Sequence, residues 1–176
     1  MRHTPVILSL LLLASPALAQ SAGEKTGVNS LLGIAPKTED FVKEAASSDM
    51  FEIQSSQLAA ERSKDEATKT FATHMIADHQ KTTADIKGMI SSGALKADVP
   101  TAMIPTHQKL FDALKDLQGD DFTKRYHDEQ VTAHKDAVSL YQRYAKGGDN
   151  QGLKDWAGKT QPALEEHLKM AQDLDK

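Results

Sequence analysis

Four long segments of the sequence place apolar or small residues at helical spacing, and each carries one ionisable side chain within that stripe. These side chains are Glu52, His79, His134 and His167. A helix turns such a stripe toward its neighbours, so the pattern predicts that all four lie inside a helical bundle. Burying a charge or an imidazole is costly unless it is paired or bound to an ion. The sequence therefore predicts either a metal site or a buried hydrogen-bond network.

The helical spacing predicts where each segment begins and ends. We expect helices over residues 38–62, over 65–92, from 120 or 121 to 146, and from about 151 nearly to the C-terminus. Residues 93–119 hold two prolines and the short amphipathic segment HQKLFDALKDLQ, which indicates a long crossover instead of a tight hairpin. Since no segment alternates β-branched residues, the predicted class is an all-α four-helix bundle with one long connection.

The height of the four residues along the bundle permits them to meet. His79 and His134 each lie near the middle of a predicted helix, so they match in height whether the second and third long helices run parallel or antiparallel. The spacing leaves that relation open.

The first 19 residues have the pattern of a Sec-type signal peptide. Arg2 precedes an apolar run, and Ala17-Leu18-Ala19 forms a small-residue cleavage site. We expect cleavage after Ala19, a flexible lead-in over residues 20–37, a bundle domain over 38–176, and a mature protein in the periplasm or secreted. No later stretch is long and apolar enough to predict a membrane span, and the lack of cysteine excludes disulfides and a lipoprotein anchor.

The overall charge excludes one class of partner. The formal net charge is −4 and aromatic residues make up only 5% of the chain. A mildly acidic surface does not attract nucleic acid, and few aromatic rings are present on which bases could stack. We therefore expect no nucleic-acid partner.

Several runs resemble a known family. FVKEAASSDMFEIQSSQLA, FATHMIADH, YHDEQVTAHKDAV and LEEHLKMAQ are similar, in order and spacing, to the exported bacterial DUF4142 family, over roughly residues 38–175. The resemblance implies a ferritin-like four-helix bundle. It also implies that Glu52, His79, His134 and His167 occupy recurrent polar positions of the family, with Tyr126 another. It implies no particular activity.

The sequence departs from the ferritin-like di-iron pattern. That pattern needs Glu-x-x-His on two of the helices, whereas Ile76 stands three residues before His79 and Leu164 three before His167. Neighbouring acids such as Asp78 are turned about 100° away on a helix, so we expect Glu52 to be the only inward carboxylate. Three imidazoles and one carboxylate suit a single zinc, iron(II) or copper(II) ion.

Other side chains could support such a site. Tyr126 and Gln130 share the inward face with His134 and are candidate hydrogen-bond partners. Met75 and Met170 lie close to His79 and His167 along their helices, where thioethers would suit copper(I) or simply pack in the core. We expect His74 and His107 at the surface, and His127 facing solvent or acting as a fifth ligand.

Two interpretations of function follow. The first is an exported bundle that binds one transition-metal ion and serves in metal handling or envelope stress. The alternative is a metal-free structural or partner-binding envelope bundle, in which the buried histidines bond to Glu52, Tyr126 or Gln130. The sequence identifies no catalytic residue.

Overall fold

The computed structural model describes residues 27–174, and every regular element in that range is a helix. The prediction of an all-α fold is confirmed, and each long helix begins and ends within two residues of its predicted bounds. The expected signal peptide lies outside the described residues, as do residues 20–26 of the expected lead-in. The helices are α2 (Val28–Leu31), α3 (Thr38–Arg62), α4 (Glu66–Ser91), α5 (Pro105–Lys115), α6 (Gly119–Gly147) and α7 (Gln151–Leu174).

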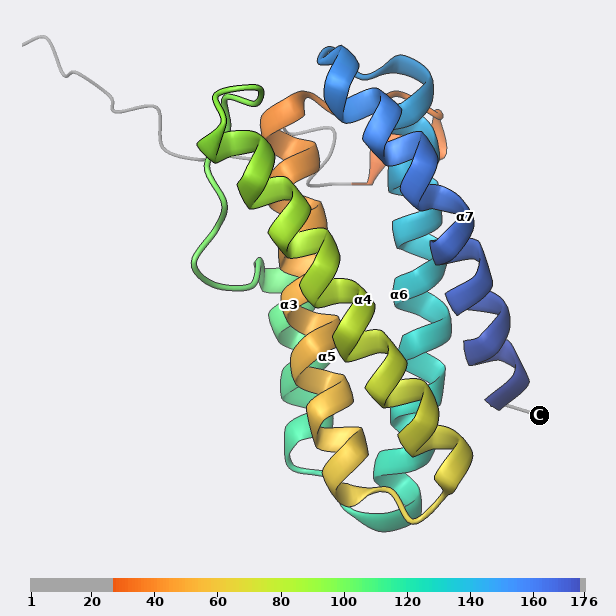
Figure 1. Ribbon diagram of the computed structural model, residues 1–176. Coiled ribbons are helices and arrows are strands. Elements are labelled where there is room, and N and C mark those ends of the chain that lie inside the picture. The colour runs from red at the N-terminus through yellow and green to blue at the C-terminus, as the bar shows by residue number, and fades with distance from the viewer. Residues whose placement is uncertain (1–26, 175–176) are drawn as a thin grey trace, which may run out of the picture.

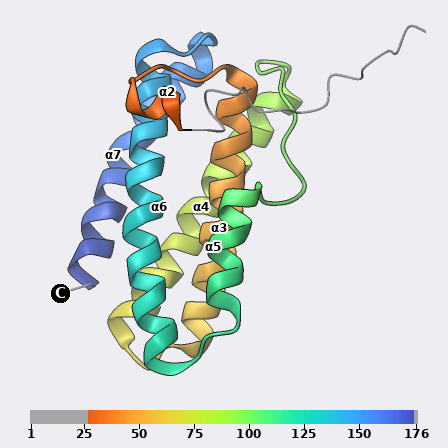
Figure 2. The same cartoon turned by 180° about the vertical axis from the view of Figure 1, so that it is seen from behind.

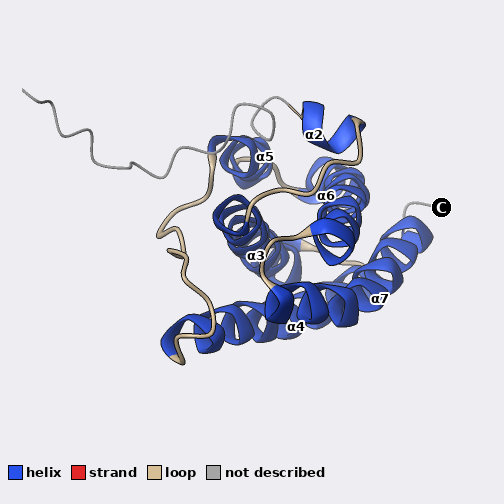
Figure 3. Cartoon of the chain, turned by 90° about the horizontal axis from the view of Figure 1, so that it is seen from above, coloured by secondary structure: helices blue, strands red, loops and turns tan. Residues whose placement is uncertain are grey.

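The long helices form two antiparallel hairpins, α3 with α4 and α6 with α7 (Figure 1). After α4 the chain returns along the length of the bundle through α5, which packs beside α3 (Figures 2 and 3). Because of this return, α6 begins at the end of the bundle where α4 begins. The two helices therefore run parallel, which settles the relation that the sequence left open.

The apolar core is divided into two clusters at different heights. The first lies toward the start of α3 and the second toward its end. A polar layer separates them, made of Asp49, Glu52, His79, His134 and His167, each between 1 and 3% exposed. The main members of the first cluster are Phe41, Val42, Ile86, Leu140, Tyr141, Tyr144, Leu153 and Leu164. Those of the second are Phe51, Phe71, Met75, Leu114, Phe122, Tyr126 and Ala171.

These two clusters supply the stability that the polar layer cannot. Fully burying one large apolar side chain contributes about 1.5–3 kcal/mol. Burying an imidazole or a carboxylate costs free energy unless each polar atom finds a partner. The polar layer is thus held in place by the packing above and below it.

Polar side chains cap the helix ends. Asp65 accepts hydrogen bonds from the backbone amides of Ala67 and Thr68 at the start of α4, and Asn150 accepts one from Leu153 at the start of α7. The first turn of α3 is capped from another part of the chain, since Asp149 accepts from the backbone amide of Thr38 at 3.0 Å. This long-range cap ties the start of α3 to the turn between α6 and α7.

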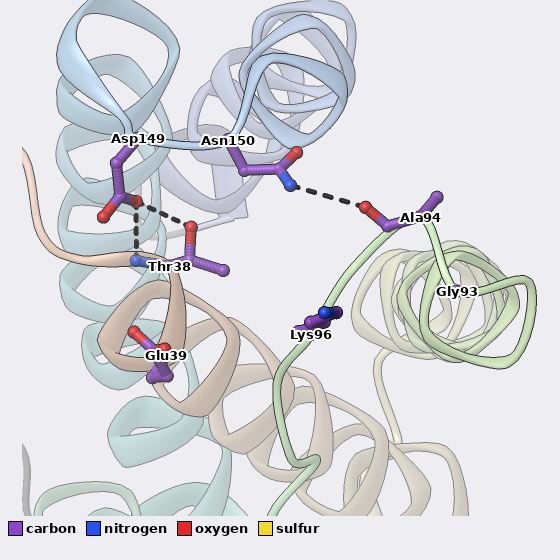
Figure 4. A pocket seen from close by; sticks show the side chains of 7 residues that line it. All are labelled: Thr38, Glu39, Gly93, Ala94, Lys96, Asp149 and Asn150. Atoms are coloured by element: carbon purple, nitrogen blue, oxygen red, sulfur yellow. Dashed lines mark hydrogen bonds between the residues drawn. The ribbon is translucent and has the colours of Figure 1, made fainter.

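A surface pocket of about 350 Å³ opens beside this cap (Figure 4), and none of its lining residues belongs to the polar layer. Two of its polar groups already bond to each other, because Thr38 donates to Asp149 through both its amide and its hydroxyl. Its other lining residues include two exposed charged side chains, Glu39 and Lys96. Its lining residues are Thr38, Glu39, Gly93, Ala94, Lys96, Asp149 and Asn150.

The described part of the lead-in contacts the bundle. It contains α2, and its Pro36 is buried. Arg143 of α6 donates a hydrogen bond of 2.7 Å to the carbonyl of Ile34.

Within residues 27–174, the helices are all too short or too polar to cross a membrane.

Candidate metal centre

Three imidazoles from three different helices meet in the polar layer. His79 comes from α4, His134 from α6 and His167 from α7. Their ring centroids are 5.7 Å (79 to 134), 5.7 Å (79 to 167) and 5.4 Å (134 to 167) apart. One ring nitrogen of each lies within 4.8 Å of those of the other two. The structure thus brings together all three histidines that the sequence singled out.

One ring nitrogen of His79 is hydrogen-bonded to a carboxylate. Nδ1 of His79 lies 2.8 Å from Oδ1 of Asp49, and the other carboxylate oxygen of Asp49 accepts a 2.9 Å hydrogen bond from Thr83. Because Asp49 offers only acceptors when ionised, the proton of a neutral His79 stays on Nδ1. The lone pair then lies on Nε2.

The other two histidines are oriented in the same way. Nδ1 of His134 donates to the backbone carbonyl of Gln130 at 2.9 Å, and Nε2 of His167 donates to Asp78 at 2.9 Å. A carbonyl and a carboxylate both require a donor, so the lone pairs of His134 and His167 lie on Nε2 and Nδ1 respectively. Partners of this kind fix the tautomer and ring orientation of histidines that bind metals.

The three remaining ring nitrogens have no hydrogen-bond partner among the described residues, although they are buried. They are Nε2 of His79, Nε2 of His134 and Nδ1 of His167. Leaving a buried polar atom unpaired costs about 1–3 kcal/mol. Tetrahedral ligands at zinc–nitrogen distances of about 2.0–2.1 Å are about 3.3 Å apart, and one ring nitrogen of each histidine lies within 4.8 Å of those of the others.

Glu52 lies beside the three histidines with both carboxylate oxygens buried and unpartnered within the described residues. Its Oε1 is 3.9 Å from Nδ1 of His134. It is not one of the residues whose ligand atoms fall within 4.8 Å of one another. Burial raises the pKa of Glu52 to about 7, and the nearby His79 opposes that shift. A carboxyl group with this pKa is only partly ionised near neutral pH.

Burial also acts on the imidazoles. It lowers the pKa of His134 to about 3, with the neighbouring His79 adding to the effect, and it lowers the pKa of His167. For His79 the burial effect is outweighed by Asp49 and Glu52, so its pKa is raised. His134 and His167 are thus held in the neutral form that binds metals.

The four predicted supporting residues have different surroundings. Gln130 contacts the site through its backbone carbonyl, while its side-chain amide donates to Ser55 at 3.4 Å. The Tyr126 hydroxyl shares a 2.8 Å hydrogen bond with Ser56. Met75 is fully buried in the second apolar cluster and Met170 packs against it. Core packing accounts for both methionines.

Two acidic residues at the site were not expected there. The expectation that Glu52 is the only inward carboxylate is wrong, because Asp49 is buried one helical turn before it on α3. The spacing of three residues on one helix face could have revealed Asp49. Asp78 is half-exposed but reaches His167, since α7 packs against that side of α4. Only the packing of the two helices shows this contact.

Two histidines outside the site differ from their predicted exposure. His107 is half-buried, and a 2.8 Å hydrogen bond joins its Nδ1 to Ser47. His127 is 9% exposed, with Nε2 bonded to Thr68 at 2.8 Å, so it neither faces solvent nor joins the site. The His107 ring contacts α3 and the His127 ring contacts the start of α4. His74 is exposed, as predicted.

The sequence matches a family model over all the residues that the structure describes. The model of a domain of unknown function, DUF4142, matches residues 23–174. The chain belongs to the DUF4142 family. None of the curated proteins compared with this DUF4142 protein matches it.

A solved structure described as "CopM in the Cu(II)-bound form" has a similar fold. The TM-score is 0.67 at 15% sequence identity, and the similarity covers 81% of the DUF4142 chain and 97% of the other. At this identity the likeness shows that the two proteins share a helical-bundle architecture.

Proposed function

We propose that this DUF4142 protein binds one transition-metal ion through His79, His134 and His167, with Glu52 as the fourth group. The observation that carries the proposal is the set of buried, unpartnered atoms: three imidazole nitrogens and one carboxylate within a single polar layer. One ring nitrogen of each imidazole also donates a hydrogen bond to an acceptor, which leaves the lone pair on the other ring nitrogen.

The ligand chemistry favours copper(II) or zinc. Imidazole nitrogens suit zinc, copper, iron and nickel, and affinity for a given site rises toward copper(II) along the first-row series. The similar protein named above was solved with Cu(II) bound, which makes copper the first ion to test.

The burial of the site suits metal handling better than catalysis. All four residues are at most 3% exposed, so a bound ion would be shielded from substrates and from competing ligands. Together with the signal-peptide pattern of residues 1–19, this supports a role in retaining or delivering a metal ion outside the cytoplasm, including under envelope stress.

Metal content tests the proposal directly. The mature chain, produced without an affinity tag, would be dialysed against copper(II) or zinc, passed over a desalting column and measured by elemental analysis. We expect about one ion per chain for the wild type and a drop in affinity of more than roughly 100-fold for His79→Ala and His134→Ala.

The matched control is His127→Ala, which removes a buried histidine of α6 that lies outside the polar layer. It should bind the ion as the wild type does. Substoichiometric metal in the wild type, or equal loss of metal in all three variants, would contradict the proposal.

A further inference from the structure

A second group of ligand-type side chains begins at the surface and ends at the buried site. His74 and Asp78 are four residues apart on α4, and Nε2 of His74 lies 3.1 Å from Oδ2 of Asp78. The same oxygen accepts the 2.9 Å hydrogen bond from Nε2 of His167 on α7. One carboxylate thus bridges an exposed imidazole and an imidazole of the polar layer.

Exposure falls stepwise along this group. The side chains of His74, Asp78 and His167 are 49%, 40% and 3% exposed. One ligand atom of each lies within 4.8 Å of those of the other two. Two imidazoles and a carboxylate at this separation form a donor set for a divalent transition metal.

His167 belongs to both groups through opposite sides of its ring. Its Nε2 faces Asp78, whereas its Nδ1 is buried and unpartnered. His74 also packs edge-on against this ring, with centroids 5.5 Å apart. An ion held by His74 and Asp78 is therefore separated from the buried site by a single imidazole.

We propose that His74, Asp78 and His167 form a loading site that captures a divalent metal ion at the surface and passes it to the buried site. The proposal rests on the function proposed above. When an ion binds at Nε2 of His167, the proton that this nitrogen donates to Asp78 is released to solvent, and no electron is transferred. When the ion passes to Nδ1, Nε2 takes up a proton again and re-forms its hydrogen bond to Asp78.

A purely structural role for this group makes a different prediction. If Asp78 only orients His167 and His74 only pairs with Asp78, removing His74 leaves the rates of metal binding unchanged. If His74 lies on the path of the ion, its removal slows binding and release together. The affinity of the buried site then stays the same.

Stopped-flow kinetics distinguish these cases. Copper(II) loading of the metal-free mature protein, and removal of the ion by excess EDTA, would be followed in wild type, His74→Ala and Gln80→Ala. Gln80→Ala is the control, because Gln80 is an exposed residue of the same helix. We expect His74→Ala to slow both rates about tenfold with an unchanged equilibrium affinity, and the control to match the wild type.

The outcomes separate the two proposals. A wild type that binds copper, with unchanged rates in His74→Ala, overturns the loading site and leaves the buried site standing. A wild type that binds no copper overturns both. A loss of equilibrium affinity in His74→Ala, without slower release, also contradicts a role in loading.

A second measurement examines the loading site alone. The double variant His79→Ala/His134→Ala removes two buried ligands and keeps His74, Asp78 and His167. Copper(II) electron paramagnetic resonance should show one weakly bound ion, which disappears when His74→Ala is added. Circular dichroism checks the fold of the double variant, and the kinetic comparison decides the question if that variant is unfolded.

Discussion

Buried and half-buried histidines occur in two regions of this protein, and they differ in how their nitrogens are satisfied. At the periphery, His107 bonds to Ser47 and His127 bonds to Thr68. In the polar layer, each of the three histidines makes one hydrogen bond outward and leaves its other nitrogen buried without a partner among the described residues. Burial alone therefore does not suggest a metal site. The metal proposal rests on the buried, unpartnered atoms that gather in the polar layer.

The apolar surroundings explain why this difference persists. The two peripheral rings each lie within hydrogen-bond distance of a hydroxyl group, Ser47 of α3 for His107 and Thr68 of α4 for His127. The polar layer lies between two clusters made mainly of apolar side chains. An unpartnered imidazole in that position is costly unless an ion occupies the centre.

Metal should stabilise only a protein with an intact polar layer. At free metal 1,000-fold above the dissociation constant, the free energy of unfolding should rise by about 4 kcal/mol, because the ion binds the native state. Urea unfolding of wild type, His134→Ala and His127→Ala, each with and without metal, measures this. The gain should appear in the wild type and in His127→Ala and vanish in His134→Ala. Equal stability of the wild type with and without metal would favour the metal-free alternative.

Acid should act on the peripheral region through His107. Burial lowers the pKa of His107 to about 4 from its usual 6.5. The unfolded chain therefore binds the proton first as the pH falls, so His107 contributes stability above pH 6.5 that is lost between pH 6.5 and about 4. This loss is about 3 kcal/mol. Urea unfolding at several pH values should show a shallower acid dependence for His107→Asn than for the wild type, and parallel curves would contradict this.

The outward hydrogen bonds should tune the affinity of the polar layer. Asp49→Asn keeps an acceptor near His79 but removes the negative charge, so the affinity for metal should fall roughly 10- to 100-fold, or about 1.4–2.7 kcal/mol. Competition with a chromogenic chelator measures the change. Asp112→Asn, which alters a surface ion pair with Lys115, is the control and should bind as the wild type does. An unchanged affinity in Asp49→Asn would show that this carboxylate does not support the site.

The smallest effect is expected at His127. Thr68→Val removes the hydroxyl that bonds to its Nε2, at a cost of about 1 kcal/mol in the free energy of unfolding. Metal content should not change, because neither residue belongs to the polar layer. Thermal unfolding and elemental analysis of the same sample test both parts. A loss of metal would break the distinction between the two regions.

Sequence periodicity predicted the helices and the inward residues because both are local properties. The bounds of α3, α4, α6 and α7 follow from apolar spacing and from stop signals such as Gly147-Gly148. Glu52, His79, His134 and His167 stood out because each interrupts an apolar stripe. Their common burial agrees with that pattern.

The partners of these residues were less predictable because they depend on contacts between helices. Asp78 lies off the inward stripe of its own helix, yet it reaches His167 across the contact between α4 and α7. Ser47 and Thr68 satisfy histidines 59 or 60 residues away in the chain. Helical spacing carries no information about such pairs.

By itself, the sequence determined the all-α class, the helix bounds and the four ionisable residues that face inward, because a 3.6-residue period fixes which side of a helix is apolar. The tertiary structure alone decided that α4 and α6 run parallel, which nitrogen of each histidine is left free, and that Asp78 links the buried site to the surface. These depend on how whole helices pack, and packing is set by long-range contacts that no local pattern records.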